Sequence, residues 1–123
     1  MNGRVLLIED EPNIVEAIGF LLSRDGWEVR SHSDGATALQ AVERLKPDIV
    51  VLDVMLPGRS GYDVLRDLRK TPGLEELPVL MLTARGQSRD KELAEGAGAS
   101  GFMTKPFSNS EMLKAVRALA PAG

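Results

Sequence analysis

The amino-acid sequence predicts an α/β fold: a doubly wound, five-stranded parallel sheet with helices on both faces. Short apolar runs alternate along the chain with amphipathic helical segments, which is the pattern of repeated strand–helix–strand units. The runs at 5–8, 48–53 and 78–82 are almost continuously apolar, as expected for strands that are buried on both faces. At 123 residues, the chain has the length of one domain.

Turn and cap residues delimit the elements of the first half. A helix is expected to begin at Pro12, because proline suits the first helical turn, and to run to Arg24. Residues 27–31 alternate between apolar and polar, as in a strand with one face in water. Ser33 is expected to cap a second helix, whose apolar residues recur every third position over 36–45.

Two capping motifs mark helices in the second half. Ser60 with Asp63 begins one helix, and Ser108 begins the last one within a Ser-x-x-Glu box. Between them we expect a short helix over 89–95 and a brief strand over 101–104. For five strands of this size, the order 2-1-3-4-5 of the flavodoxin-like arrangement is the best prediction, because right-handed crossovers exclude most others.

Composition and charge narrow the functional classes. The net charge of −3 and the isoelectric point near 5.2 do not suggest the basic face that direct nucleic-acid binding needs. No apolar run approaches the ~18 residues of a membrane span, and no signal peptide is recognisable. The absence of cysteine excludes disulfides and thiolate metal sites. We therefore expect a cytoplasmic protein that does not bind membranes.

Carboxylate, hydroxyl and ammonium side chains follow four of the five predicted strands. Because parallel strands end at one edge of the sheet, and ligands bind at that edge in open α/β sheets, we expect these side chains to converge. Each of them alone is typical of a turn or a cap, but together they indicate a functional site. They are Glu9 and Asp10 after the first strand, Asp53 at the end of the third, Thr83 after the fourth and Lys105 after the fifth.

Three neighbouring carboxylates point to a metal and to phosphate chemistry. They repel one another and need a counter-charge, which a hard divalent cation such as Mg²⁺ supplies through carboxylate, water and phosphate oxygens. Lys105 offers a point charge suited to a phosphoryl oxygen. Asp53 is then a candidate nucleophile that takes a phosphoryl group as an acyl phosphate.

Four motifs resemble those of the response-regulator receiver domain, the CheY-like domain of two-component signalling. They are Ile8-Glu9-Asp10-Glu11, Asp53-Val54-Met55-Leu56-Pro57 with Gly61, Thr83-Ala84, and Lys105-Pro106-Phe107. The resemblance implies a signalling switch rather than an enzyme, although it assists its own phosphorylation and dephosphorylation. It also implies that Asp53 accepts a phosphoryl group from a phosphohistidine of a sensor histidine kinase or histidine phosphotransfer protein.

The resemblance also assigns roles around Asp53. It implies that Glu9, Asp10 and Asp53 hold Mg²⁺ together with the backbone carbonyl of Met55. Thr83, Ala84 and Lys105 are implied to contact the phosphoryl group. Met55 and Arg85 are expected to flank the mouth of the site, where we predict that they control the approach of water.

A switch and an output face follow from the same resemblance. Thr83 is implied to move toward the phosphoryl group while Phe102 turns inward, which changes a face made of the fourth helix, fifth strand and fifth helix. A downstream protein or a fused effector domain reads this face. Ser100 and Gly101 replace an acidic pair that helps to dimerise receivers of winged-helix transcription factors, so a monomer is expected although Arg117 is present.

The position of Phe20 leaves two alternatives. It falls on the polar side of its helix, so it either packs on the last helix or belongs to the kinase-docking surface that this family has on the first helix.

Other functions fit the sequence less well. Residues 96–101 match the dinucleotide motif G-x-G-x-x-G but follow a helix and precede a strand, which is the wrong context. A dehalogenase-type phosphatase would need an aspartate where Met55 stands. Two alternatives remain open: a receiver domain over 1–119 cut from a larger regulator, with 120–123 as a tail or the start of a truncated linker, and a phosphorylation-independent interaction module.

Overall fold

The computed structural model describes residues 3–84 and 88–121, except for the side chains of 88–90. Five parallel strands form one sheet in the order β2-β1-β3-β4-β5, so the predicted fold and strand order are confirmed. The strands are β1 (Gly3–Ile8), β2 (Trp27–His32), β3 (Ile49–Asp53), β4 (Val79–Thr83) and β5 (Gly101–Thr104). The helices are α1 (Pro12–Arg24), α2 (Ala38–Leu45), α3 (Gly61–Lys70), α4 (Ser88–Gly96) and α5 (Asn109–Leu119).

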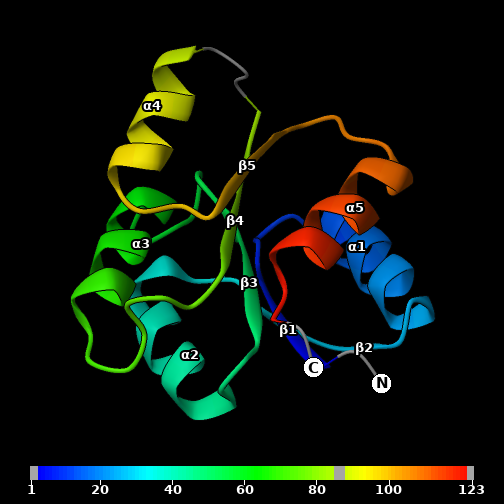
Figure 1. Cartoon of the computed structure of the whole chain (residues 1–123), viewed down its shortest axis with the longest axis horizontal. Helices are drawn as coiled ribbons and strands as arrows, with labels where there is room; N and C mark the ends of the chain where they lie inside the picture. Colours follow the sequence, from blue (N-terminus) through cyan, green and yellow to red (C-terminus); the bar gives the residue numbers. More distant parts are fainter. Residues whose placement is uncertain (1–2, 85–87, 122–123) are drawn as a thin grey trace.

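Two helical layers cover the sheet. Helices α1 and α5 lie on one face, and α2, α3 and α4 lie on the other (Figure 1). Successive strand residues point to opposite faces, so β3 contributes Val50 and Leu52 to one core cluster and Ile49 and Val51 to the other. Every residue of β3 and β4 is buried, which explains their nearly continuous apolar sequences.

The predicted caps of α3 and α5 are present. Ser60 Oγ accepts a hydrogen bond from the amide of Asp63 at 3.2 Å, which begins α3. Ser108 Oγ accepts from the amide of Glu111, and the Glu111 carboxylate accepts from the amide of Ser108, which completes a capping box. Both pairs satisfy amide groups that the first turn of a helix leaves without a partner.

The predicted cap of the second helix at Ser33 is wrong. Asp34 accepts a hydrogen bond from the amide of Ala36 at 2.8 Å and begins a short 3₁₀ turn, η1 (Gly35–Thr37), so α2 starts only at Ala38. The turn is tight because Gly35 meets the loop after β3: its amide donates to Pro57, and a Cβ there would overlap the Arg59 carbonyl.

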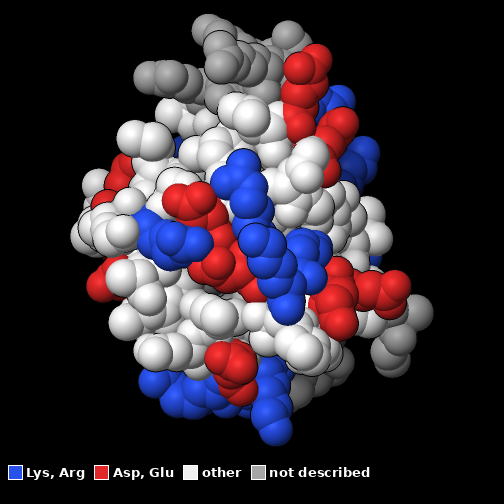
Figure 2. Space-filling model, turned by 90° about the vertical axis from the view of Figure 1, so that its left-hand side faces the viewer, with Lys and Arg blue, Asp and Glu red and all other residues white. Residues whose placement is uncertain are grey.

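Charges of both signs are interleaved on the face that carries α2, α3 and α4 (Figure 2). Two ion pairs contribute to this pattern: Arg59 with Asp67 at 2.7 Å and Arg66 with Asp63 at 3.1 Å. Among the residues that the structure describes, no helix combines the length and the apolar character needed to cross a bilayer.

Candidate functional site

The carboxyl edge of the sheet brings the predicted acidic residues together. Glu9 follows β1, and its amide donates to the carbonyl of His32 at 3.0 Å, which extends the strand pairing into the site. Asp53 is the last residue of β3. Carboxylate oxygens of Glu9, Asp10 and Asp53 lie within 4.8 Å of one another. Glu9 and Asp53 are buried, and Asp10 is exposed, so the cluster opens toward solvent on the side of Asp10.

Lys105 enters this cluster from β5. Its amide donates to the carbonyl of Thr83 at 2.7 Å, which fixes its backbone beside the end of β4. Its Nζ lies 2.7 Å from Glu9 Oε1, 3.3 Å from Asp53 Oδ1 and 3.9 Å from Glu11 Oε1. Because its side chain is only 13% exposed, the ammonium group acts within a partly desolvated environment.

The Glu9 carboxylate is held by the backbone as well as by Lys105. Its Oε2 accepts from the amides of Asp10 at 3.0 Å and Glu11 at 3.2 Å, so the side chain folds back under its own loop. These bonds and the Lys105 ammonium stabilise the ionised form of Glu9 inside the protein.

The carboxyls of Glu9 and Asp53 differ in their affinity for a proton. Burial raises the pKa of Asp53 to about 7, the nearby Glu9 carboxylate adds to the rise, and Lys105 opposes it. Burial also acts to raise the pKa of Glu9, but hydrogen bonds with Lys105, Asp53 and the Glu11 backbone outweigh it and lower that pKa. Burial acts to lower the pKa of Lys105, whereas the two carboxylates raise it overall.

The loop after β3 is held close to Asp53. The amide of Met55 donates to Asp53 Oδ1 at 3.4 Å, and the amide of Gly61 donates to the carbonyl of Val54 at 2.8 Å. A Cβ at Gly61 would overlap the carbonyl oxygen of Asp53, so only glycine fits where α3 begins. The Met55 side chain is 73% exposed beside the cluster.

The remaining predicted site residues lie along β4 and β5. Thr83 is buried at the end of β4, on the strand next to Asp53, and Ala84 after it is exposed. Phe102 is half-buried and packs against the core cluster on the α2–α4 face of the sheet. Arg85 lies outside the described residues.

The sequence analysis gave Glu11 no individual role, although the structure places it beside Lys105. The sequence did indicate that Glu11 belongs to the site, because Glu11 continues the acidic run that follows β1. With Glu11 included, three carboxylates lie within 3.9 Å of the Lys105 ammonium group, and Asp10 adds a fourth carboxylate to the cluster. This excess of negative charge, carried by oxygen ligands alone, suits a hard divalent cation.

Comparison with known proteins gives the family. The model of the response regulator receiver domain matches residues 5–117. The chain belongs to this family. Receiver domains are signalling domains of two-component systems, and the family match favours this function over the dinucleotide-binding and phosphatase alternatives.

The receiver domain is similar to two regulators and to a solved receiver structure. It is 45% identical to the "Probable transcriptional regulatory protein TcrX" of Mycobacterium tuberculosis over 94% of the chain and 48% of that protein. It is 43% identical to the alkaline phosphatase synthesis transcriptional regulatory protein PhoP of Bacillus subtilis, over 97% of the chain and 49% of that protein. The chain thus spans about half the length of these relatives.

The solved structure is the receiver domain of the sensor histidine kinase PA1611 from Pseudomonas aeruginosa, which has a magnesium ion coordinated in its active site cleft. It is 28% identical, with a TM-score of 0.88 over 97% of this chain and 98% of the other.

Proposed function

We propose that this receiver domain is a phosphorylation-dependent switch whose acceptor is Asp53. The observation that carries the proposal is the buried Asp53 carboxylate, 2% exposed, with Lys105 Nζ 3.3 Å away and further carboxylates beside it. A carboxylate next to a cation and a cation-binding cluster suits attack on phosphorus better than a structural role.

The phosphoryl group is proposed to come from a phosphohistidine of a sensor histidine kinase or histidine phosphotransfer protein. One oxygen of Asp53 forms the new bond to phosphorus while the bond from phosphorus to the imidazole nitrogen breaks. The electron pair of that bond stays on the imidazole, which then takes a proton from water. Lys105 lies within reach of the transferred oxygens and offsets their negative charge, and Thr83 and Ala84 at the end of β4 contact them.

The resident cofactor is proposed to be Mg²⁺, held by Glu9, Asp10 and Asp53 with the backbone carbonyl of Met55. The clustered carboxylate oxygens support this assignment, as does the magnesium ion of the PA1611 receiver domain. When bound, the cation neutralises charge on the phosphoryl oxygens and on the carboxylates. We also propose that the domain assists its own phosphorylation and dephosphorylation.

Met55 and Arg85 are proposed to flank the site mouth and limit the access of water to the acyl phosphate. The exposed Met55 side chain next to Asp53 supports this role. Replacement of both residues, Met55→Asn with Arg85→Ala, should change the rate of dephosphorylation. Equal rates in the double variant and the wild type would refute the role.

The output is proposed to pass from Thr83 through Phe102 to the face formed by α4, β5 and α5. Phe102 has no hydroxyl and packs against the core, which supports a switch that works by packing. A downstream protein or a fused effector domain would read this face. If Phe102→Ala signalled normally, this part of the proposal would fail.

Arg117 is engaged within the chain: its guanidinium pairs with Asp25, the residue that follows α1, and its Nε donates at 3.0 Å. We therefore propose no dimer through the α4–β5–α5 face. Residues 1–119 are proposed to be the receiver domain, and 120–123 a tail or the start of a linker.

Treatment with acetyl phosphate and Mg²⁺, followed by intact-mass measurement, tests the acceptor. The wild type should gain one phosphoryl group, and Asp53→Asn should gain none while it keeps its fold. Asp48→Asn is the matched control: Asp48 lies before the same strand, accepts from the amide of Arg4 at 2.8 Å and is remote from the site. An unmodified wild type would instead favour a phosphorylation-independent interaction module.

A further inference from the structure

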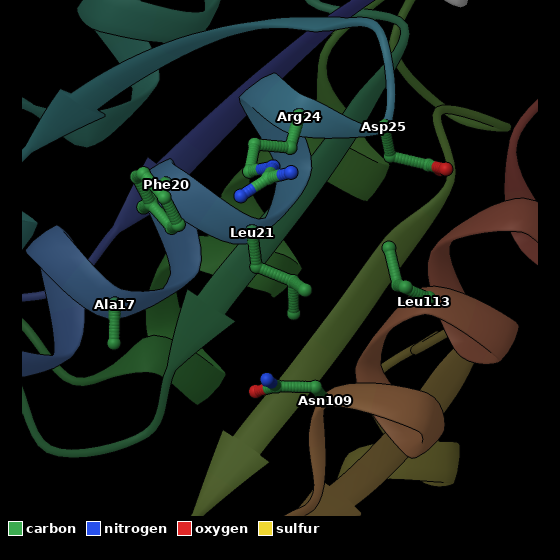
Figure 3. Close-up of a pocket in the computed structure, with 7 residues that line it drawn as sticks. All are labelled: Ala17, Phe20, Leu21, Arg24, Asp25, Asn109 and Leu113. Atoms are coloured by element: carbon green, nitrogen blue, oxygen red, sulfur yellow. The ribbon is translucent and has the colours of Figure 1, made fainter.

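Helix α1 presents an aromatic ring beside a groove that it forms with α5. Phe20 is 65% exposed on the outer face of α1. Next to it, a groove of about 490 Å³ runs between α1 and α5 (Figure 3). Its lining is mixed: Ala17, Leu21 and Leu113 are apolar, and Arg24, Asp25 and Asn109 are charged or polar. A projecting ring and a recess on one surface are what a self-complementary, two-fold contact requires, because each copy supplies both features.

The charges on α1 have the same symmetry around Phe20. Glu16 lies four residues before Phe20 and Arg24 four residues after it, so all three occupy one face of the helix. Both charged residues are exposed, and the Arg24 guanidinium lies 5.5 Å from the centre of the Phe20 ring. When two such helices cross antiparallel near Phe20, Glu16 of each copy faces Arg24 of the other.

The charged residue next to Arg24 in the chain, Asp25, has partners of its own. Asp25 is already bound by Arg117 and by the indole nitrogen of Trp27 at 3.3 Å. On α5, the groove is lined by the neutral residues Asn109 and Leu113. The exposed face of α1 therefore carries a negative group, Glu16, on one side of Phe20 and a positive group, Arg24, on the other.

We propose that the outer face of α1, namely Glu16, Ala17, Phe20 and Arg24, is the interface of a symmetric dimer of this chain. The two α1 helices pack antiparallel, Phe20 of each copy covers the groove of the other at Ala17, and two Glu16–Arg24 pairs flank the rings. The contact is small, so the association is weak and reversible. It revises the expectation of a monomer, and it does not depend on phosphorylation of Asp53.

Charge reversal and its rescue test the interface by sedimentation equilibrium of the chain, at concentrations up to about 1 mM, chosen to detect a weak contact. The wild type and Asp53→Asn should both self-associate. Glu16→Arg alone and Arg24→Glu alone should each weaken the dimer by about tenfold or more, because each change replaces two attractive pairs by repulsive ones. The double variant restores both pairs with reversed polarity and should recover the wild-type affinity to within about threefold.

Two further variants complete the test. Phe20→Ser should abolish association, whereas Lys70→Glu, an exposed reversal on α3 across the sheet, should leave it unchanged. Phosphorylation by acetyl phosphate checks that each variant of α1 and the Lys70→Glu variant keep an intact site. A wild type that is monomeric at the highest concentration, or a double variant that associates no better than the single ones, overturns the proposal. So does a Phe20→Ser variant that associates normally, or one whose only defect is slower phosphotransfer from a kinase.

Discussion

Lys105 Nζ lies 2.7 Å from Glu9 Oε1, which is closer than its 3.3 Å to Asp53 Oδ1. This ion pair joins the ends of β1 and β5, which are separated in the sheet by β3 and β4. The ammonium group mainly offsets the negative charge of Glu9. Of the two carboxyls, Glu9 therefore has the lowered pKa and Asp53 the raised one. This arrangement predicts how the free energy of unfolding depends on the charges of the site and on bound Mg²⁺.

Lys105→Met should destabilise the domain because it leaves the buried Glu9 carboxylate without its cation. In the presence of a chelator, we expect the free energy of unfolding to fall by about 1–3 kcal/mol in urea titrations. The loss should be smaller with Mg²⁺, since the bound cation replaces the missing positive charge. Lys114→Met, at an exposed position on α5, is the control. Equal effects of the two substitutions would contradict this reading of the ion pair.

The raised pKa of Asp53 predicts a pH-dependent stability. The folded protein holds this proton with a pKa of about 7, against an ordinary value of 3.8. Protonated Asp53 therefore favours folding at low pH, and this contribution is lost as the pH rises through about 7. With a chelator present, the stability of the wild type relative to Asp53→Asn should fall between about pH 4 and pH 8, by on the order of 1–3 kcal/mol.

The Asp53→Asn comparison removes the titrating group itself, while the other carboxyls are present in both proteins. Saturating Mg²⁺ should remove most of the difference, since the cation favours ionised carboxylates. Chemical denaturation at a series of pH values measures it. A difference that is constant across this range would show that burial does not raise the pKa of Asp53.

Gly61→Ala should distort the site, because the added methyl group would overlap the carbonyl oxygen of Asp53. We expect the free energy of unfolding to fall by about 1–3 kcal/mol and phosphorylation by acetyl phosphate to slow. Gly19→Ala in α1 is the matched control: nothing lies within 4 Å of its Cβ, so it should stabilise the domain by about 0.5–1 kcal/mol. Similar thermal midpoints for the two variants would refute the close approach.

Hydrogen bonds from Arg69 anchor the segment between α4 and β5 to α3. Its guanidinium donates to the carbonyls of Gly98 at 2.9 Å and Leu74 at 3.1 Å, and to Ser100 Oγ at 3.4 Å. Arg69→Ala should therefore lower the free energy of unfolding by about 1–2 kcal/mol. It should also increase hydrogen exchange at the amides of 97–100.

Arg66→Ala is the control for Arg69, since Arg66 lies on the same helix, is exposed and pairs with Asp63 one turn away. Its effect should stay within about 0.5 kcal/mol. If Arg66→Ala opened the 97–100 segment as much as Arg69→Ala, the anchoring role would be lost.

The fold was predictable because continuous apolar runs in the sequence indicate which strands are buried on both faces. The apolar runs of β3 and β4 cannot face water on either side, and a parallel topology then places Glu9, Asp53 and Lys105 at one edge. The error at Ser33 came from tertiary structure, since the turn there depends on the contact of Gly35 with a loop more than twenty residues away.

Side-chain pairing within the site could not be predicted. The sequence places one ammonium group among several carboxylates, but only the folded geometry shows that Lys105 pairs more closely with Glu9 than with Asp53. The same holds for Phe20, which the sequence left between two alternatives. In the structure its ring stays largely exposed at the rim of the groove between α1 and α5.

Amide NMR spectra recorded with and without beryllofluoride and Mg²⁺ test the central claim, that a group bound at Asp53 changes the output face. The account predicts shifts for Asp53, for Thr83 at the end of β4 and for Phe102 on β5 in the wild type, and no beryllofluoride-dependent shift in Asp53→Asn. Shifts confined to the site, with Thr83 and Phe102 unchanged, would contradict a switch.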